Sequence, residues 1–223
     1  MKDYFISFAV PLRQLLHAIV NVHDLHVKWL NTLSYLENCG ARKIANCEHP
    51  TRVKKEMLKH AAEEFRHAHY LKKQISRVSE LEVEDYSLKY LLGGIASLHY
   101  LNKLDLLSSR YLYKNLSLPK QVVKEVSYLF VTYAIELRAA ELYPIYDVAL
   151  REASSKVKVK SILLEEEEHL REMEEGMQKI LCGVHYARHI CSIEANLCQN
   201  WLNAVAQEVS VGKKRFGERQ LIA

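Results

Sequence analysis

The sequence contains few of the residues that interrupt helices. Only 7 glycines and 4 prolines occur in 223 residues, while leucine, glutamate, lysine, alanine and arginine are plentiful. Those five residue types favour helix formation, whereas glycine and proline disfavour it within an element. This composition argues against a strand-rich or collagen-like chain. We therefore expect an all-α protein with almost no strand.

Cysteine pairs and long apolar runs are also missing. The five cysteines are odd in number and contain no Cys-x-x-Cys pair, which argues against a disulfide framework and against a zinc ribbon. The apolar run near the N-terminus is too short for a signal peptide, and no later run approaches membrane-spanning length. The sequence thus predicts a cytoplasmic protein that does not bind membranes.

The charge balance favours no polyanionic partner. A formal net charge of +4 is small for 223 residues and is spread along the chain, with Lys213, Lys214, Arg215 and Arg219 concentrated near the C-terminus. Such a cluster is more often a solvated tail than a nucleic-acid site. We expect no nucleic-acid binding.

Apolar periodicity and turn signals divide the chain into six helical segments. We expect a single domain spanning residues 1–223, with a core bundle at about 12–181, an extra helix at about 184–209 and a basic tail at 210–223. A helical crossover, bent at Gly93 and Gly94, should join the second bundle helix to the third. The four bundle helices are expected after Pro11 to about 47, at about 51–78, at 119–153 and at 156–181, with the crossover at 86–115 after a loop at 79–85.

Two similar segments suggest a function. Glu64 precedes His67 by three residues, and Glu166 precedes His169 by three residues, each within a predicted helix. Positions i and i+3 lie on one face of a helix, so both members of each pair can point at the same place. Carboxylate and imidazole groups arranged in this way are suited to binding metal ions.

Two further carboxylates lie on apolar stripes at similar depths. Glu37 interrupts the stripe of the first helix, and Glu136 that of the third. Glu141, on the adjacent stripe of the third helix, is the alternative to Glu136. We favour Glu136, because small residues follow it at the same offsets at which Gly40 and Ala41 follow Glu37.

Two metal ions held between four helices need about six protein ligands that carry enough negative charge. Buried carboxylates without a neutralising partner are costly, and this also favours a metal. In the expected arrangement, Glu64 and Glu166 bridge the ions and each histidine binds one of them. The predicted ligands, which are also the predicted catalytic residues, are Glu37, Glu64, His67, Glu136, Glu166 and His169.

This pattern resembles the ferritin-like di-iron carboxylate superfamily, in which two helices supply one Glu each and two others supply Glu-x-x-His. The resemblance covers roughly residues 30–177. It implies a ferritin-like four-helix bundle with two iron ions, or one manganese and one iron, that react with dioxygen or peroxide. The shorter spacing between the glutamates, the crossover and the extra C-terminal helix favour an oxidase or oxygenase over an iron store.

Our hypothesis is a dinuclear non-haem metal oxidoreductase that acts on a small organic substrate. The alternatives are an iron-binding or storage protein and a metal-free helical scaffold. The expected partners are the substrate and dioxygen, with an electron donor and a homodimer through the fifth helix also considered.

Neighbouring residues receive simpler interpretations. We expect Arg66 to pair with a carboxylate, and Tyr70 and Tyr133 to be the tyrosines nearest the site. Apolar walls are assigned to Leu33, Phe65, Leu129 and Met173. Glu165, Glu167 and Glu168 are expected to be exposed, and structural roles are assigned to His60, His69, His99, His185 and His189.

Overall fold

A computed structural model of the chain describes residues 2–49, 51–80 and 83–220, with side chains described as far as residue 212. All regular elements in these ranges are helical, which confirms the all-α prediction. The α-helices are α1 (Ala9–Val20), α2 (His23–Cys47), α3 (Lys55–Gln74), α4 (Gly94–Asn115), α5 (Lys120–Glu152), α6 (Lys160–Gln178) and α7 (Gly183–Gln220), with short 3-10 helices η1 (Ile75–Arg77) and η2 (Leu88–Tyr90).

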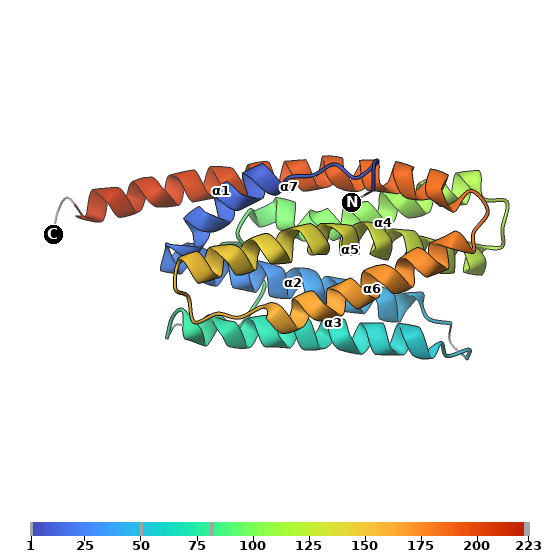
Figure 1. Ribbon diagram of the computed structural model, residues 1–223, viewed down its shortest axis with the longest axis horizontal. Coiled ribbons are helices and arrows are strands. Elements are labelled where there is room, and N and C mark those ends of the chain that lie inside the picture. Colours follow the sequence, from blue (N-terminus) through green and yellow to red (C-terminus); the bar gives the residue numbers. More distant parts are fainter. Residues whose placement is uncertain (1, 50, 81–82, 221–223) are drawn as a thin grey trace.

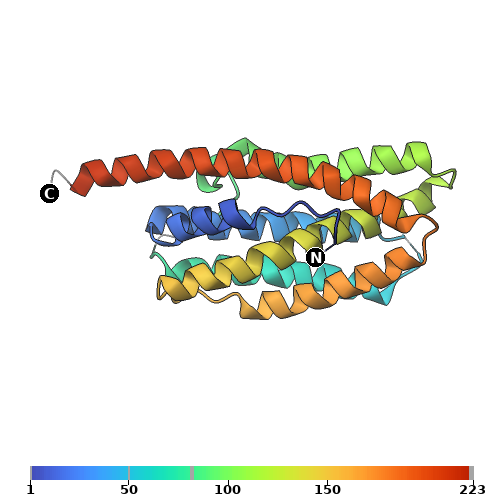
Figure 2. The same ribbon diagram turned by 45° about the horizontal axis from the view of Figure 1, so that its top comes forward.

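The long helices form an elongated helical bundle (Figure 1). Helices α2 and α3 pack against each other along their length, as do α5 and α6. In both ribbon views α2 and α5 lie in the middle of the bundle, with α3 and α6 on one side and α4 and α7 on the other (Figure 2). The middle helices are therefore covered from several directions, and side chains from α2, α3, α5 and α6 can meet inside the bundle.

The predicted first helix is two helices. The chain leaves helical geometry after α1, and α2 begins at His23. The Asn21 side-chain amide donates a hydrogen bond to the carbonyl oxygen of His17, which is one of the carbonyls left free at a helix C-terminus. Asn21 therefore ends α1, and α1 packs mainly against α5. The predicted end of the longer helix at residue 47 is confirmed.

The crossover to α5 ends at residue 115 and is interrupted at Gly93 and Gly94 as predicted, but residues 86–93 contain only the short η2. Helix α4 begins at Gly94, and Gly93 and Gly94 have φ angles of 80° and 48°, a region that glycine enters at little cost. A Cβ atom at Gly93 would lie only 2.9 Å from Cγ2 of Val205 on α7, so this turn also requires a small residue. Residues 81 and 82 of the predicted loop lie outside the described residues.

The third bundle helix was predicted to within about a residue at each end, because Pro119 directly precedes α5. The second and fourth were predicted too long: α3 ends at Gln74 before η1, and α6 begins only at Lys160. Helix α7 continues to Gln220, through most of the predicted tail. The side chains of the basic cluster in this segment lie outside the described ones.

Helix α7 packs on the bundle of its own chain. The ring of Trp201 stacks between Tyr100 of α4 and Trp29 of α2, with ring centroids 5.2 and 5.7 Å away. Its indole N–H donates a hydrogen bond of 2.9 Å to the Ser97 hydroxyl. Because this contact is fully buried, α7 contributes to the core rather than extending free of it.

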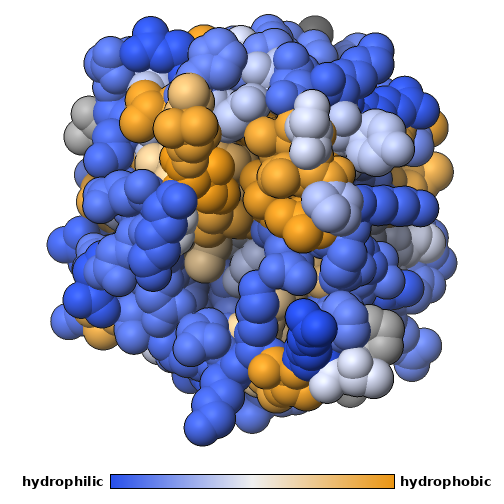
Figure 3. Space-filling view, turned by 90° about the vertical axis from the view of Figure 1, so that its right-hand side faces the viewer, coloured by the Kyte–Doolittle hydropathy of each residue, from blue (hydrophilic) through white to orange (hydrophobic). Residues whose placement is uncertain are grey.

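Among the described residues, no helix is long and apolar enough to span a membrane. At the end of the bundle where α4 leads into α5 and α6 into α7, apolar side chains lie among mostly hydrophilic ones (Figure 3). The exposed apolar residues of these connections and the adjoining helix ends include Leu118, Leu181 and Val184.

Candidate metal centre

The structure brings the six predicted residues to one place in the bundle. Helix α3 supplies Glu64 and His67, and α6 supplies Glu166 and His169, one turn apart in each case. Glu37 reaches the same region from α2 and Glu136 from α5. All are buried except Glu37, which is partly buried. Each carboxylate lies on the inward face of its helix, as its position on an apolar stripe predicts.

The six predicted residues and His60 form two groups, and the potential ligand atoms of each group lie within 4.8 Å of one another. One group is His60, Glu64, Glu136 and His169, and the other is Glu37, Glu64, His67 and Glu166. Glu64 belongs to both groups. Either group has enough donor atoms, close enough together, to hold a metal ion.

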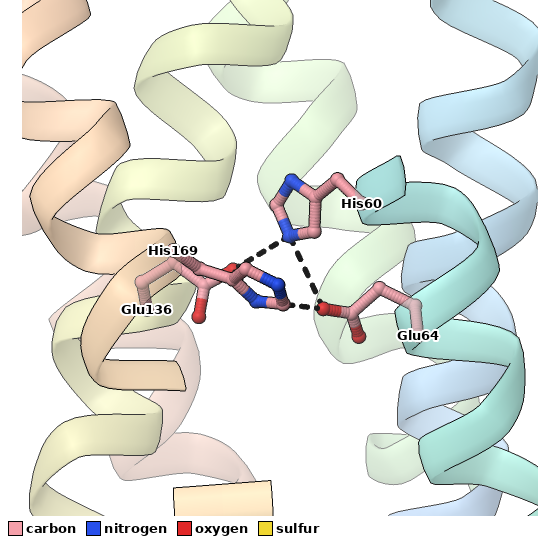
Figure 4. Close-up of side chains that lie close together, drawn as sticks. All are labelled: His60, Glu64, Glu136 and His169. Carbon is pink, nitrogen blue, oxygen red and sulfur yellow. Dashed lines mark hydrogen bonds and ion pairs between the residues drawn. The ribbon is translucent and has the colours of Figure 1, made fainter. Parts of the chain in front are cut away.

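Figure 4 shows the first group. His60 Nε2 lies 3.2 Å from Oε1 of Glu64 and 3.2 Å from Oε1 of Glu136. His169 approaches the same two carboxylates, with its Nδ1 atom at 3.5 Å from Glu64 and 3.8 Å from Glu136. A single imidazole nitrogen from each histidine therefore faces the carboxylate oxygens.

His60 is the residue that the sequence analysis missed. It precedes Glu64 by four residues on α3, so the two side chains share one face of the helix. The predicted ligand pairs follow the pattern Glu-x-x-His, whereas His60 and Glu64 form the reverse pattern His-x-x-x-Glu, for which a structural role was expected. His60 is 1% exposed and contacts two carboxylates. The sequence signal for it is the spacing of four residues to Glu64, which places both side chains on one face of α3 as a spacing of three does.

In the second group, His67 lies beside Glu166 with Nδ1 and Oε1 3.0 Å apart. The hydroxyl of Tyr143 donates a hydrogen bond to Oε1 of Glu37. Tyr143 is fully buried, and it lies on α5 two turns after Glu136. Tyr143 therefore orients the one carboxylate of the cluster that is not fully buried.

The other ring nitrogen of each histidine is held from outside the cluster. His67 Nε2 lies 2.7 Å from Oε2 of Glu165, and His169 Nε2 lies 2.9 Å from Oε2 of Glu63. His60 Nδ1 lies 3.0 Å from the Tyr128 hydroxyl. A carboxylate acceptor fixes the proton on the outer nitrogen, so that the inner nitrogen presents a lone pair.

These outer contacts correct one expectation and confirm another. Glu165 was expected to be exposed, but it is partly buried because it accepts hydrogen bonds from both His67 and Arg66. Arg66 pairs with a carboxylate as expected, with Nη2 2.5 Å from Oε2 of Glu165. Glu167 and Glu168 are exposed, as expected.

Several inward atoms of the cluster lie within 3.0–3.2 Å of one another but make no well-aligned hydrogen bond. In the part of the chain that the structure describes, eleven buried side-chain N and O atoms have no hydrogen-bond partner, and five of them belong to the predicted ligands. Buried polar atoms in folded proteins are nearly always paired, so this concentration needs a specific cause. The five atoms are Glu64 Oε1, His67 Nδ1, Glu136 Oε2, Glu166 Oε1 and His169 Nδ1.

The carboxylates repel one another when charged. Burial, together with the neighbouring carboxylates, raises the pKa values of Glu37, Glu136 and Glu166 well above the usual range. Burial also acts to raise the pKa of Glu64, but close contacts with His60 and Glu37 and the charges of His60 and His67 outweigh it and lower this pKa to about 2. Four buried acids at one point thus favour either bound protons or a bound cation.

The histidines respond in opposite directions. Burial opposes the charged form of His67, but its close contact with Glu166 and the charges of the nearby carboxylates raise its pKa to about 9. The pKa of His169 is lowered, by burial first and then by the charge of His60. In the metal-free protein, a proton on His67 therefore offsets part of the negative charge of the carboxylates. A bound cation would displace this proton.

Glu141 lies outside the cluster. Its Oε2 atom is 2.5 Å from Nη1 of Arg138, and its Oε1 atom accepts a hydrogen bond from the Ser7 hydroxyl. The backbone N–H of Phe8 donates to the same carboxylate. Glu141 therefore fixes the N-terminal segment to α5, and Glu136 is the α5 carboxylate in the candidate site.

The tyrosines and apolar walls differ from those expected. The Tyr133 hydroxyl lies 2.7 Å from that of Tyr4, whereas Tyr128 and Tyr143 contact the cluster. Phe65 is 42% exposed and therefore does not form an inner wall, because the i, i+1 offset from Glu64 turns it toward solvent.

Two of the histidines to which structural roles were assigned contact one tyrosine ring. His185 lies 3.4 Å from the Tyr111 hydroxyl, and His189 stacks on the same ring.

A mostly apolar cavity of about 90 Å³ adjoins the cluster. Four cluster carboxylates form part of its wall, namely those of Glu37, Glu64, Glu136 and Glu166. Of the four predicted wall residues only Leu33 lines it, and the rest of the apolar wall includes Leu36, Leu101, Ile135, Leu142 and Tyr143. A small molecule in this cavity would touch the carboxylates directly.

Comparison with known proteins gives no assignment: the chain matches no family model, no curated protein and no solved structure. The function must therefore be argued from the geometry of the site.

Proposed function

We propose that the protein is a dinuclear non-haem metal oxidoreductase of the ferritin-like type, which uses dioxygen or peroxide to oxidise a small organic molecule. The concentration of unpaired inward atoms on Glu64, His67, Glu136, Glu166 and His169 is the observation that carries this proposal. A metal ion can be coordinated by carboxylate oxygens and imidazole nitrogens at the same time, and it would thus satisfy all of these atoms.

The donor set fits two divalent ions. Four carboxylates supply four negative charges, which balance two dications, and three neutral imidazoles complete the set. Mixed carboxylate and imidazole donors, without thiolates, suit iron and manganese. Bound here, such ions would supply redox chemistry with dioxygen or peroxide.

The chain's own residues divide the work of binding. Glu64 lies in both groups and would help to hold an ion at either position, while His67 and His169 belong to different groups. Glu63 and Glu165 hold the outer nitrogens of these imidazoles, which fixes the ring orientations before any ion arrives. His60 adds a nitrogen to the group of Glu136 alone, so the two positions differ.

The bundle also controls access to the site. The helices bury the inward atoms of the cluster, and the apolar cavity walls limit the water that can reach them. Exclusion of water strengthens electrostatic interactions within the site and protects reactive species from side reactions. The arrangement supports oxidation of a substrate within the cavity more than accumulation of iron, because the space beside the cluster is only about 90 Å³.

Metal analysis tests the proposal. Protein refolded with ferrous iron, with manganese or with both should bind about two ions per chain. The double variant Glu64→Ala/His169→Ala should bind fewer than one ion per chain. The control His69→Ala, which replaces an exposed histidine of α3, should bind as many ions as the unaltered protein does. The ferrous form should consume dioxygen rapidly without accumulating further iron. Metal content that does not respond to the double variant would overturn the proposal.

His60 gives a finer test. His60→Ala should weaken one of the two ions by roughly ten- to a hundredfold and leave the other, because His60 belongs to one group only. Stoichiometric titration of the metal-free protein, followed by the absorption or paramagnetic resonance of the bound ions, resolves the two events. Equal weakening of both would show that the two positions are not distinct.

A further inference from the structure

The apolar cavity beside the cluster shares part of its wall with a second, polar one. We call the first the inner chamber, lined by Leu33, Leu36, Leu101, Ile135, Leu142 and Tyr143 and ending on the cluster carboxylates. The second, the outer cleft, has a volume of about 640 Å³ and is lined by residues that include Arg42, Lys43, Asn46, Asn102, Asp105 and Lys124. Lys43, Cys47 and Asp105 line both.

An ion pair stands at the boundary of the two spaces. The Nζ atom of Lys43 on α2 lies 3.1 Å from Oδ2 of Asp105 on α4, and both side chains are partly exposed. Lys43 follows Glu37 by six residues on α2, which places it about 9 Å farther along the helix axis. Lys43 and Glu37 are thus offset along α2 by about the length of a short organic chain, and both line the same cavity.

The outer cleft is basic. Arg42, Lys43 and Lys124 face a single acid, Asp105, among its lining residues. Among the described residues, neither Arg42 nor Lys124 has an ion-pair partner, and the buried Ser127 hydroxyl in the same lining has no hydrogen-bond partner. Cationic groups and an unpaired hydroxyl at the entrance to an apolar space match a ligand with an anionic head and an apolar tail.

We infer that the outer cleft and the inner chamber together bind a small amphipathic carboxylate, with its carboxylate at Lys43 and its apolar tail directed toward the cluster. The inference rests on the proposed function in taking this ligand as the substrate that is oxidised. A ligand carboxylate replaces Asp105 as the partner of Lys43, and the chain carbons farthest from the carboxylate then lie nearest Glu37 and Glu136. A cationic ligand is disfavoured at the entrance, and a neutral one gains nothing there.

The probes are hexanoate, hexan-1-ol and hexylamine, added to metal-free and to metal-loaded protein. Binding is followed by tryptophan fluorescence, because Trp201 lines the inner chamber. Hexanoate should bind at least about fivefold more tightly than hexan-1-ol, and hexylamine more weakly than either. Equal affinities, or a preference for the amine, would overturn the inference.

Two variants locate the site. Lys43→Gln should weaken hexanoate binding about five- to tenfold and leave hexan-1-ol unchanged. The matched control is Lys28→Gln, which removes another half-buried lysine of α2 whose Nζ pairs with Glu208. Ala139→Leu, which fills the inner chamber, should abolish binding of both probes. If Lys28→Gln loses the preference for hexanoate, or if Lys43→Gln keeps it, the anion binds elsewhere and the inference is wrong.

Metal content measured on the same samples separates the two proposals. About two ions per chain without selective hexanoate binding overturns the inference and leaves the proposed function. Selective hexanoate binding, dependent on Lys43, in protein that takes up no metal supports the binding site and overturns the oxidoreductase function.

Discussion

The Nε2 atom of His67 on α3 lies 2.7 Å from Oε2 of Glu165 on α6. The inverse contact joins His169 on α6 to Glu63 on α3 at 2.9 Å. In each helix the sequence Glu-Glu-x-x-His thus supplies an inner carboxylate, a histidine, and an outer carboxylate that orients the histidine of the other helix. This exchange ties α3 and α6 together at the site, although the two helices come from different halves of the chain.

The exchange predicts a loss of metal affinity from residues that touch no metal. Glu63→Gln should lower affinity for ferrous iron or manganese by about tenfold to a hundredfold, because the His169 ring loses the charged acceptor that fixes its tautomer and orientation. Competition with a fluorescent chelator measures the change.

Glu167→Gln is the control for this prediction. Glu167 is an exposed glutamate of α6, so its replacement changes the net charge equally and should leave the affinity within about twofold. An equal loss in both variants would mean that long-range charge, rather than the contact with His169, sets the affinity.

Glu136 should have opposite effects on the metal-free and metal-loaded protein. Burial and the neighbouring carboxylates raise the pKa of Glu136, so folding of the metal-free chain at neutral pH must protonate this carboxyl, and Glu136→Gln, which removes that cost, should raise the free energy of unfolding by about 1–3 kcal/mol. Metal affinity should fall, because an amide is a poorer ligand. Urea unfolding with chelator and with saturating metal gives both values.

Glu141→Gln provides the comparison within the same helix. Glu141 is paired with Arg138, so its neutralisation should destabilise both forms by about 1–3 kcal/mol and leave metal affinity unchanged. The reverse result, with Glu141→Gln stabilising the metal-free chain, would show that the two carboxylates had been assigned the wrong way round.

Local patterns in the sequence identified the parts of the site that lie within single helices. Glu64 with His67 and Glu166 with His169 could be paired because three residues along a helix always return to nearly the same face. Glu37 could be found because a single acid on an apolar stripe is unusual. These inferences need only the period of the helix, and the structure brings the residues together.

Other parts of the site depend on contacts between distant segments. Both Glu136 and Glu141 are buried because α5 packs against α1, α4, α6 and α7, so burial on an apolar stripe could not distinguish them. What distinguishes them is the N-terminal segment, where Ser7 and Phe8 donate hydrogen bonds to Glu141. The break between α1 and α2 that allows this packing was itself missed. No periodicity within α5 carries that information.

A buried histidine away from the candidate metal centre should make stability depend on pH. His26 of α2 is 2% exposed, and its Nε2 atom lies 2.7 Å from the Tyr146 hydroxyl. Burial, with a smaller effect of the charge of His23, lowers the pKa of His26 to about 4 from its usual 6.5. As pH falls below 6.5, the unfolded chain therefore takes up a proton that native His26 does not, and the free energy of unfolding falls until the pH reaches about 4. Between about pH 7.5 and pH 5 this contribution should be about 2 kcal/mol.

Urea unfolding of the metal-free chain at these two pH values measures this contribution as a difference between variants, in which the titration of all other groups cancels. His26→Gln keeps a polar partner for Tyr146 and should lose about 2 kcal/mol less than the unaltered protein on acidification. His17→Gln replaces an exposed histidine of α1 and should follow the unaltered protein. An identical pH dependence in all three proteins would mean that His26 accepts a proton in the native state as readily as in the unfolded chain. The bond to Tyr146 would then be made by a charged, buried imidazole, which no carboxylate of the described residues accompanies in an ion pair.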